Sequence, residues 1–227
     1  MTSSSHKILA IECTHQSISV AAVGLRGVVE ETVHQWQRTA ESIIPLADRV
    51  LAAAEMVMSD IDFLALSSGP GSFTALRIGM ATAKGMAYGL GLPLVTVSTM
   101  EAIAASALEE IGSCFLVPVI PARKGEWYYA VYRANEKGLE EVEKTAYVPV
   151  DSLREILERY RGRCAVVAKD IGQLEEVCRR AGVDAVKADF FTAVSLIPIA
   201  EKTYMAGEVP SLEMVTPDYL QQFRSNR

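Results

Sequence analysis

The segment SSGPGSFTALRIGMATAKGMAY, residues 67–88, contains the strongest structural signals in the chain. It continues the apolar run Phe63–Ser67, which predicts a buried strand. Gly69-Pro70-Gly71 breaks this strand, and Ser72 or Thr74 is expected to cap a following helix by accepting a hydrogen bond from an early backbone N–H group. We therefore expect a strand, a tight turn and a helix that pack closely together.

The predicted helix carries two apolar stripes. Small residues recur at every fourth position: Ala75, Gly79, Ala83 and Ala87. A larger stripe contains Leu76 and Met80. Because a face with so little side-chain bulk lets another backbone approach closely, we expect this helix to be clamped against a sheet or a second helix.

The glycine-rich turn has a second interpretation, since the N–H groups at the start of a helix can bind phosphate. The turn lacks the Lys-Ser/Thr ending of a P-loop and the three-glycine spacing of a dinucleotide-binding fold. The tolerance of glycine for positive φ is reason enough for glycine here. We favour a tight turn that leads into a packed helix, and an anion site stays open as the alternative.

Composition restricts the class of protein. The 227 residues can form one large domain or two small lobes, and no apolar stretch reaches the roughly 18 residues of a membrane-spanning helix. Residues 1–7 are polar and no apolar core follows them, so we do not expect a secreted protein. Four cysteines without a C-x-x-C pair favour free thiols in a reducing cytoplasm. A net charge of −6, from 22 basic and 28 acidic residues, argues against binding nucleic acid unaided.

The pattern of expected elements repeats along the chain. Each half reads as three strands followed by alternating helices and strands, starting near Ile8 and again near Phe115. We divide the chain into a first lobe, residues 1–107, and a second lobe, residues 108–227, whose last helix packs back on the first. Such a tandem predicts an α/β protein with two ribonuclease-H-like lobes, each a mixed sheet flanked by helices. This is the plan of the actin, sugar-kinase and heat-shock ATPase superfamily.

In that superfamily the turn after the first strand of each lobe organises metal and phosphates. The first turn here offers Glu12 and Thr14, which are the candidate cofactor-binding residues, although Glu12 also suits a hydrogen-bonded carboxylate at a strand end. The second turn, Pro121-Ala122-Arg123, offers no comparable ligand, since proline lacks an N–H group. The three histidines have no metal-binding spacing, so we expect no metal site.

No catalytic residue is predicted. Ser72 has no histidine at a suggestive place, and Cys13 has no flanking cation that would lower the pKa of its thiol. The aromatic run Trp127-Tyr128-Tyr129 fits a buried strand or a surface that stacks on nucleic-acid bases.

Several motifs resemble the TsaB family, also called YeaZ. They are Ile8–Thr14, Ser68–Gly79, Ala83–Ala87, Val97–Ala102 and the tail Pro217–Leu220. The resemblance spans nearly the whole chain, and its central Gly-Pro-Gly-Ser-Phe-Thr motif is highly specific. Departures include Glu12, where the family usually has Asp, and Pro121, where the family has an Asp-Ala-Arg turn.

The resemblance implies a non-catalytic subunit that supports the making of threonylcarbamoyladenosine in tRNA. Its implied partners are a TsaD-like transferase and a TsaE-like ATPase, with tRNA bound only through the complex and a homodimer formed when the chain is alone. The resemblance implies no tightly bound cofactor, only weak binding of ATP or ADP with magnesium at the boundary with the partner. The first-lobe helices, about 40–58 and 74–88, would then pair with the partner, or equally cover the chain's own sheet. The expected interface residues are Ile43, Leu46, Val50, Leu76, Gly79, Met80, Ala83 and Ala87.

Two other classes of function stay open. The same fold could carry a nucleotide-dependent enzyme, an ATPase or kinase, that uses Glu12, Thr14 and the glycine turn. A module that binds tRNA directly would need a basic surface, for which Arg123-Lys124 and Arg224 with Arg227 are the candidates.

Overall fold

The computed structural model describes residues 6–24, 27–34, 39–111, 115–123, 125–136 and 138–218. The chain forms two compact units. The first comprises Met1–Thr99 with Thr192–Pro217, and the second comprises Met100–Phe191 with Asp218–Arg227. The helix near the end of the chain thus lies in the first unit, and the lobe boundary after residue 107 stays a prediction.

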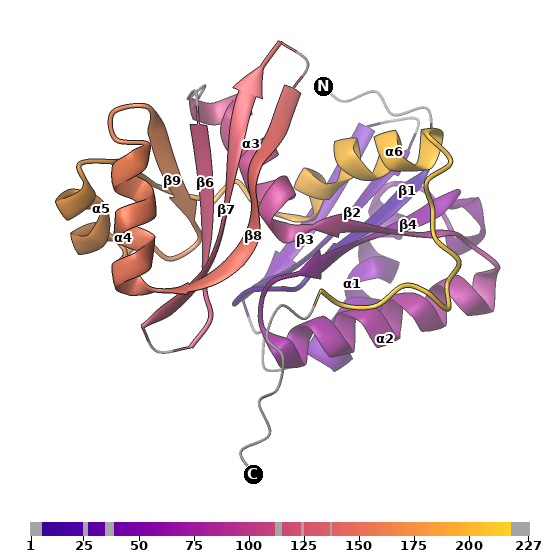
Figure 1. Ribbon diagram of the computed structural model, residues 1–227. Helices are drawn as coiled ribbons and strands as arrows, with labels where there is room; N and C mark the ends of the chain where they lie inside the picture. The colour runs from indigo at the N-terminus through magenta and orange to yellow at the C-terminus, as the bar shows by residue number, and fades with distance from the viewer. Residues whose placement is uncertain are drawn as a thin grey trace. The chain divides into compact units, whose positions relative to one another are not determined.

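A five-stranded mixed sheet forms the centre of the first unit (Figure 1). Its strands, in the order β3-β2-β1-β4-β5, are β1 (Ile8–Glu12), β2 (Ile18–Gly24), β3 (Gly27–Val33), β4 (Phe63–Gly69) and β5 (Leu94–Ser98). β1 pairs antiparallel with β2 and parallel with β4, so it runs through the middle of the sheet. β1 and β4 are buried along their whole length, which explains their continuous apolar sequences, because a strand covered on both faces needs no polar alternation.

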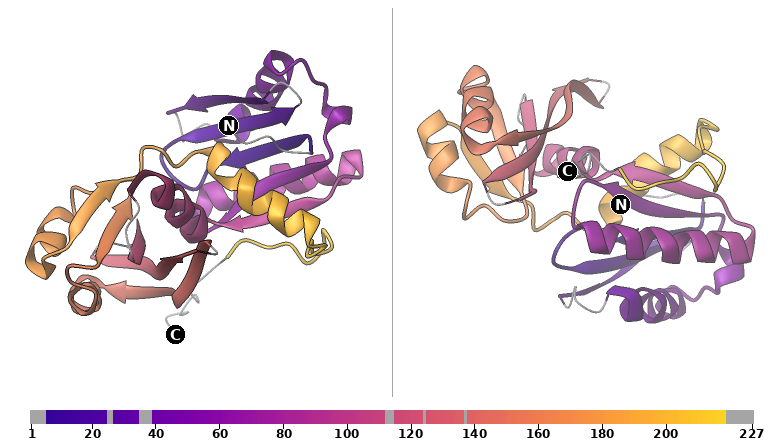
Figure 2. Two further views of the ribbon diagram at one scale, coloured as in Figure 1. Left: turned by 90° about the horizontal axis from the view of Figure 1, so that it is seen from above. Right: turned by 60° about the horizontal axis from the view of Figure 1, so that its bottom comes forward.

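Helices cover both faces of this sheet (Figure 2). On one face, α1 (Thr39–Ala53) packs against β2 and α2 (Phe73–Leu90) packs against β4, and the two helices contact each other. On the other face lies α6 (Ile197–Met205), whose Tyr204 stacks on Phe63 of β4 with ring centroids 4.3 Å apart. The first unit is therefore a three-layer sandwich with β1 and β4 at its core.

Helix α2 begins where the sequence predicted. Ser72 is its N-cap and accepts a hydrogen bond from the Ala75 N–H at 3.5 Å. The helix ends at Gly91, whose φ of 67° is the left-handed conformation that glycine adopts readily. The strand, turn and capped helix expected for this stretch are confirmed.

The structure corrects the expected partner interface. All eight residues proposed for it are buried inside the first unit: Ile43, Leu46, Val50, Leu76, Gly79, Met80, Ala83 and Ala87. The stripe of small residues faces the chain's own sheet, the alternative that the sequence left open. These side chains have almost no exposed surface that a partner could contact.

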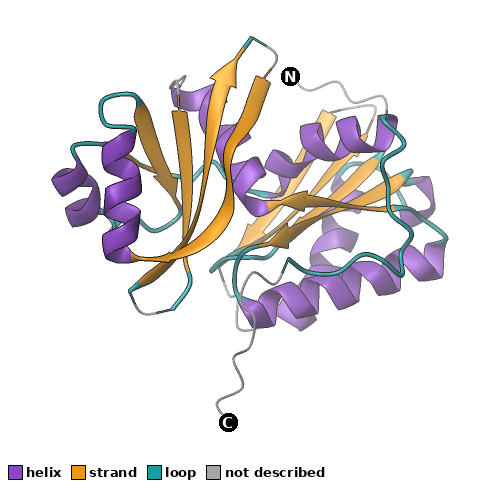
Figure 3. Cartoon of the chain, viewed as in Figure 1, coloured by secondary structure: helices purple, strands orange, loops and turns teal. Residues whose placement is uncertain are grey.

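The second unit repeats the plan of the first (Figure 3). Its sheet has the order β10-β9-β6-β7-β8, with β6 (Phe115–Pro121), β7 (Glu126–Asn135), β8 (Gly138–Pro149), β9 (Cys164–Ala168) and β10 (Asp184–Lys187). β6 pairs antiparallel with β7 and parallel with β9, as β1 does with β2 and β4. The predicted duplication of a mixed-sheet α/β unit is confirmed.

The remaining elements of the described residues are three helices and two short 3-10 helices: α3 (Thr99–Ile111), α4 (Val150–Arg159), α5 (Glu175–Ala181), η2 (Met58–Asp60) and η3 (Ala193–Leu196). Side chains of α4 and α5 pack with β6, β7 and β9 in the core of the second unit. Trp127, Tyr128 and Tyr129 are also buried, so they belong to the fold and are not a base-stacking surface.

Helix α1 is shorter than expected. α1 was predicted to continue to Met58, but it ends at Ala53, and Glu55 takes a positive φ of 55° that a regular helix cannot contain. The last helix expected in the chain is formed by η3 followed by α6.

Within the described parts of the chain, none of the helices combines the length and the apolar character that crossing a membrane requires.

We predict opposite effects for two glycine-to-alanine substitutions in α2. A Cβ at Gly79 would overlap the Cys13 Sγ, so Gly79→Ala should lower the free energy of unfolding by roughly 1–3 kcal/mol. A Cβ at Gly85 meets nothing within 4 Å, so Gly85→Ala should raise this free energy by about 0.5–1 kcal/mol, because alanine favours a helix over glycine. Urea unfolding followed by circular dichroism measures both.

A double variant tests the cause of the first effect. Cys13→Ala removes the sulfur that the new methyl group would meet. The loss of stability in Cys13→Ala/Gly79→Ala should therefore be smaller than the sum of the two single losses. Additive losses would contradict this packing.

Candidate functional site

The turn after β1 lies against the loop that leads into α2. We call residues 12–15 the β1 turn and residues 69–72 the motif loop. The Ser72 N–H donates a hydrogen bond to the Thr14 carbonyl oxygen at 2.8 Å. Gly71 approaches so closely that a Cβ on it would lie 2.6 Å from both the Cβ and the carbonyl oxygen of Thr14. Position 71 thus requires glycine for close approach of two backbones.

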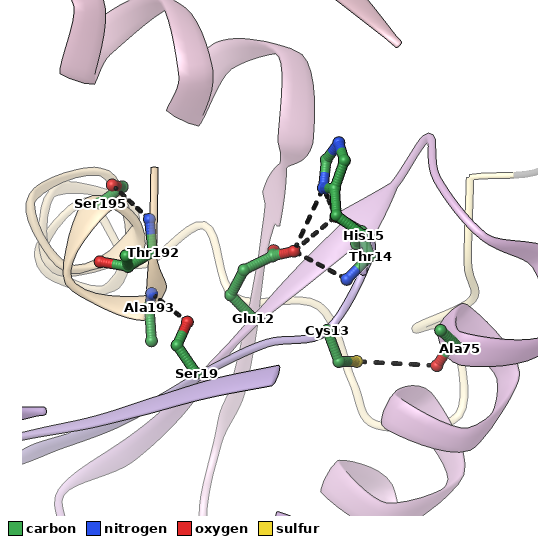
Figure 4. Close-up of polar contacts among 9 residues, drawn as sticks. All are labelled: Glu12, Cys13, Thr14, His15, Ser19, Ala75, Thr192, Ala193 and Ser195. Carbon is green, nitrogen blue, oxygen red and sulfur yellow. Dashed lines mark hydrogen bonds and ion pairs between the residues drawn. The ribbon is translucent and has the colours of Figure 1, made fainter. Parts of the chain in front are cut away.

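The two predicted cofactor-binding residues contact each other (Figure 4). The Oε1 atom of Glu12 accepts hydrogen bonds from the Thr14 N–H at 2.7 Å and from the Thr14 hydroxyl at 2.5 Å. The His15 Nδ1 lies 2.8 Å from the same hydroxyl oxygen and 3.6 Å from Glu12 Oε1. Since the hydroxyl proton goes to Glu12, the contact with His15 requires the ring nitrogen to donate.

Glu12 is a buried charge. Glu12 is only 2% exposed, and burial by itself would raise the pKa of its carboxyl group. The charge of His15, whose Nδ1 lies 3.6 Å from Oε1, together with the hydroxyls of Ser67 and Thr14, outweighs burial and lowers this pKa below its usual value. At neutral pH the β1 turn therefore holds a carboxylate inside the fold.

Cys13 points the other way, toward α2 (Figure 4). Its thiol donates a weak hydrogen bond to the Ala75 carbonyl oxygen at 3.6 Å, and its sulfur fills the space next to Gly79. Burial and the charge of Glu12 raise the pKa of this thiol. The thiolate needed for nucleophilic chemistry is thus suppressed, as the sequence predicted from the missing cation.

The other candidate residues for catalysis or ligand binding contribute to the fold. Ser72 caps α2, as expected. Pro121 ends β6 and pairs with Trp127 in the sheet of the second unit. Among the residues that the structure describes, no three His, Cys, Asp or Glu side chains come together in a way that could hold a metal ion. Arg224 and Arg227 lie outside the described residues.

Sequence reasoning missed His15 as part of the site. We considered it only as a metal ligand, for which its spacing is wrong. The available signal was its position three residues after Glu12, on the same short turn, where an imidazole can reach a carboxylate.

Acid should weaken the contribution of Glu12 to stability. Because the folded state lowers the pKa of this carboxyl group from 4.5, its contribution is full above about pH 4.5 and is lost as the pH falls through the folded-state pKa. We expect Glu12→Gln to be less stable than the wild type near neutral pH, and the difference to shrink below about pH 4.5. Urea unfolding of both proteins from about pH 7 to about pH 3 measures it, and a constant difference would contradict the charged state of Glu12.

Comparisons with known proteins identify the family. The sequence matches the family described as "TsaD: tRNA N6-adenosine threonylcarbamoyltransferase" over residues 7–193. It is 31% identical over 222 residues to the tRNA threonylcarbamoyladenosine biosynthesis protein TsaB of Escherichia coli (strain K12), with 94% of each chain covered. The protein of the same name from Bacillus subtilis (strain 168) is 26% identical over 218 residues, covering 94% of this chain and 93% of that one.

Solved structures show the same fold. YeaZ from Pseudomonas aeruginosa superposes with a TM-score of 0.79 at 22% identity, over 95% of this chain and all (100%) of that one. An uncharacterized protein with similarity to peptidase YEAZ, also from Pseudomonas aeruginosa, gives a TM-score of 0.82 at 23% identity with the same coverage. The predicted two-lobed, actin-like α/β fold is confirmed. Since one relative named TsaB is 31% identical over 94% of both chains, the chain belongs to the TsaB (YeaZ) family of tRNA threonylcarbamoyladenosine biosynthesis proteins.

Proposed function

We propose that this chain is a non-catalytic subunit in the synthesis of threonylcarbamoyladenosine in tRNA, and that it acts by binding a TsaD-like transferase. The main support for this proposal is that the chain resembles a transferase family, but donors of the turn where that fold would bind a nucleotide are already bonded within the chain. The chain matches the transferase family over residues 7–193, yet its Glu12 and Thr14 are bonded to each other inside the fold. Its described thiols are equally unsuited to nucleophilic chemistry, since burial raises the pKa of Cys164 and Cys178 to about 11.

The outer face of α2 is the surface that we propose for the partner. Arg77, Ala81, Gly85 and Tyr88 are exposed and follow one side of the helix, and Tyr88 is 83% exposed. On the neighbouring helix α1, Ile44 is 50% exposed. Alanine and glycine present little side-chain bulk, so a helix of the partner can approach α2 closely at its middle. The exposed Tyr88 on α2 and the exposed Ile44 on α1 supply apolar area for association.

From the family resemblance we also propose how this chain assembles with other molecules. A TsaE-like ATPase joins the complex, and tRNA reaches this chain only through the transferase, which suits a net charge of −6. When the transferase is absent, the same outer face of α2 joins two copies of the chain. The described cysteines Cys13, Cys164 and Cys178 are free thiols, in keeping with the reducing cytoplasm where tRNA is modified.

Reconstitution tests the proposed function. A reaction with tRNA, threonine, bicarbonate, ATP and the other synthesis components should yield threonylcarbamoyladenosine only weakly without this chain, and strongly with it. Mass spectrometry of the tRNA nucleosides measures the yield. Equal yields with and without the chain would overturn the proposal. Synthesis by the chain without the transferase would show that it is itself the catalyst.

A pair of matched variants tests the surface. Ala81→Arg places a long charged side chain in the middle of the outer face of α2, so it should abolish co-elution with the transferase. Ala206→Arg makes the same change at an exposed residue just after α6, on the opposite face of the sheet, and should leave co-elution intact. Circular dichroism confirms that both variants fold. Co-elution of a folded Ala81→Arg variant would place the interface elsewhere.

A further inference from the structure

The actin-like fold implies a nucleotide with a magnesium ion, and the β1 turn is where its phosphates would bind. The turn has the donors that recognise an oxyanion: the N–H and the hydroxyl of Thr14, and the ring of His15. The two Thr14 donors point at Glu12 Oε1, and the His15 Nδ1 lies 3.6 Å from the same oxygen. The chain's own carboxylate thus occupies the place of the ligand oxygen.

The rest of the carboxylate is also buried. Glu12 is 2% exposed, and its second oxygen, Oε2, is buried without a hydrogen-bond partner in the part of the chain that the structure describes. The Ser67 hydroxyl lies outside hydrogen-bond geometry, yet near enough to lower the pKa of Glu12. A side chain that served as a ligand for a bound metal would present this free oxygen to a cleft, whereas here it is covered by protein.

The motif loop closes the turn from the other side. The Ser72 N–H is bonded to the Thr14 carbonyl oxygen, and Gly71 leaves no room for even a methyl group against Thr14. A phosphate at this turn would compete with Glu12 for the same donors while facing a negative charge at short range. The residues present therefore do not fit the phosphates of a nucleotide.

We propose that the Glu12 carboxylate is an internal anion that occupies the β1 turn in place of phosphate and so keeps the turn closed. Internal occupation gives the N–H and the hydroxyl of Thr14 an acceptor within the fold. The same turn seats α2, through Thr14 and Ser72 and through Cys13 beside Gly79. The proposal concerns this chain alone, and does not depend on any partner.

Chemical rescue tests the internal anion. Glu12→Ala leaves the N–H and the hydroxyl of Thr14 without their acceptor, removes the carboxylate next to His15 and opens a small space there. Thermal unfolding of this variant is followed while sodium formate or sodium phosphate is added, with sodium chloride at equal ionic strength as the reference. We expect formate or phosphate to raise the melting temperature of Glu12→Ala and the rise to follow binding to a single site. The wild type and Glu12→Gln, in which the side chain still fills the space, should show no rise beyond that in chloride.

Two results of this experiment would contradict the proposal. A folded Glu12→Ala protein that formate and phosphate stabilise no more than chloride does would overturn the proposal. An equal anion-specific rise in the wild type would do the same, because it would show an open turn.

A second measurement needs no variant. In NMR spectra of the wild type titrated with inorganic phosphate and with Mg-ATP, the Thr14 amide resonance should stay in place, and its hydrogen exchange should be slow because the N–H is bonded to Glu12. A saturable shift of this resonance, or fast exchange of this amide, would overturn the proposal. Both experiments use the isolated chain, so their results are independent of whether the chain supports tRNA modification.

Discussion

The first unit depends on the contact between the β1 turn and the motif loop. This contact joins residues far apart in the chain, Thr14 and Ser72, by a backbone hydrogen bond of 2.8 Å. Ser72 is also the N-cap of α2, so the bond fixes where that helix starts. From there, Gly79 packs against the Cys13 sulfur, which lets α2 lie close to β1 and β4. One turn therefore sets the position of the helix that covers much of the sheet.

The sequence predicted the parts of this arrangement that local signals determine. An apolar run, a Gly-Pro-Gly break and a capping serine led to the right strand, loop and helix. The sequence could not show where a side chain points when the residues that it contacts are far away in the chain. The small residues of α2 suit the chain's own sheet and a partner helix equally well, and only the fold shows that they face the sheet. The burial of the Glu12 side chain and the positive φ of Glu55 could not be predicted, because glutamate is usually exposed and rarely adopts a positive φ.

The two faces of α2 follow different constraints. On the inner face, glycine at 79 is required, because a Cβ there would overlap Cys13. On the outer face, a Cβ added to Gly85 or Gly89 would meet nothing within 4 Å, so folding of the chain gives no reason for glycine. Each glycine inside a helix costs about 0.5–1 kcal/mol relative to alanine. The open space at these two positions agrees with the proposed docking of a partner helix, which needs close approach from outside.

The equivalent turns of the two units reach a similar state by different chemistry. In the first, a carboxylate takes the donors that would hold an anion. In the second, the strand ends in Pro121, which has no N–H to donate. The next backbone donor, the Ala122 N–H, bonds to the Glu126 carbonyl oxygen at 3.0 Å and so closes the hairpin on itself. In both units, therefore, donors of the turn after the first strand are bonded within the chain itself, which agrees with the proposal that the chain acts through a helix surface and not through a bound nucleotide.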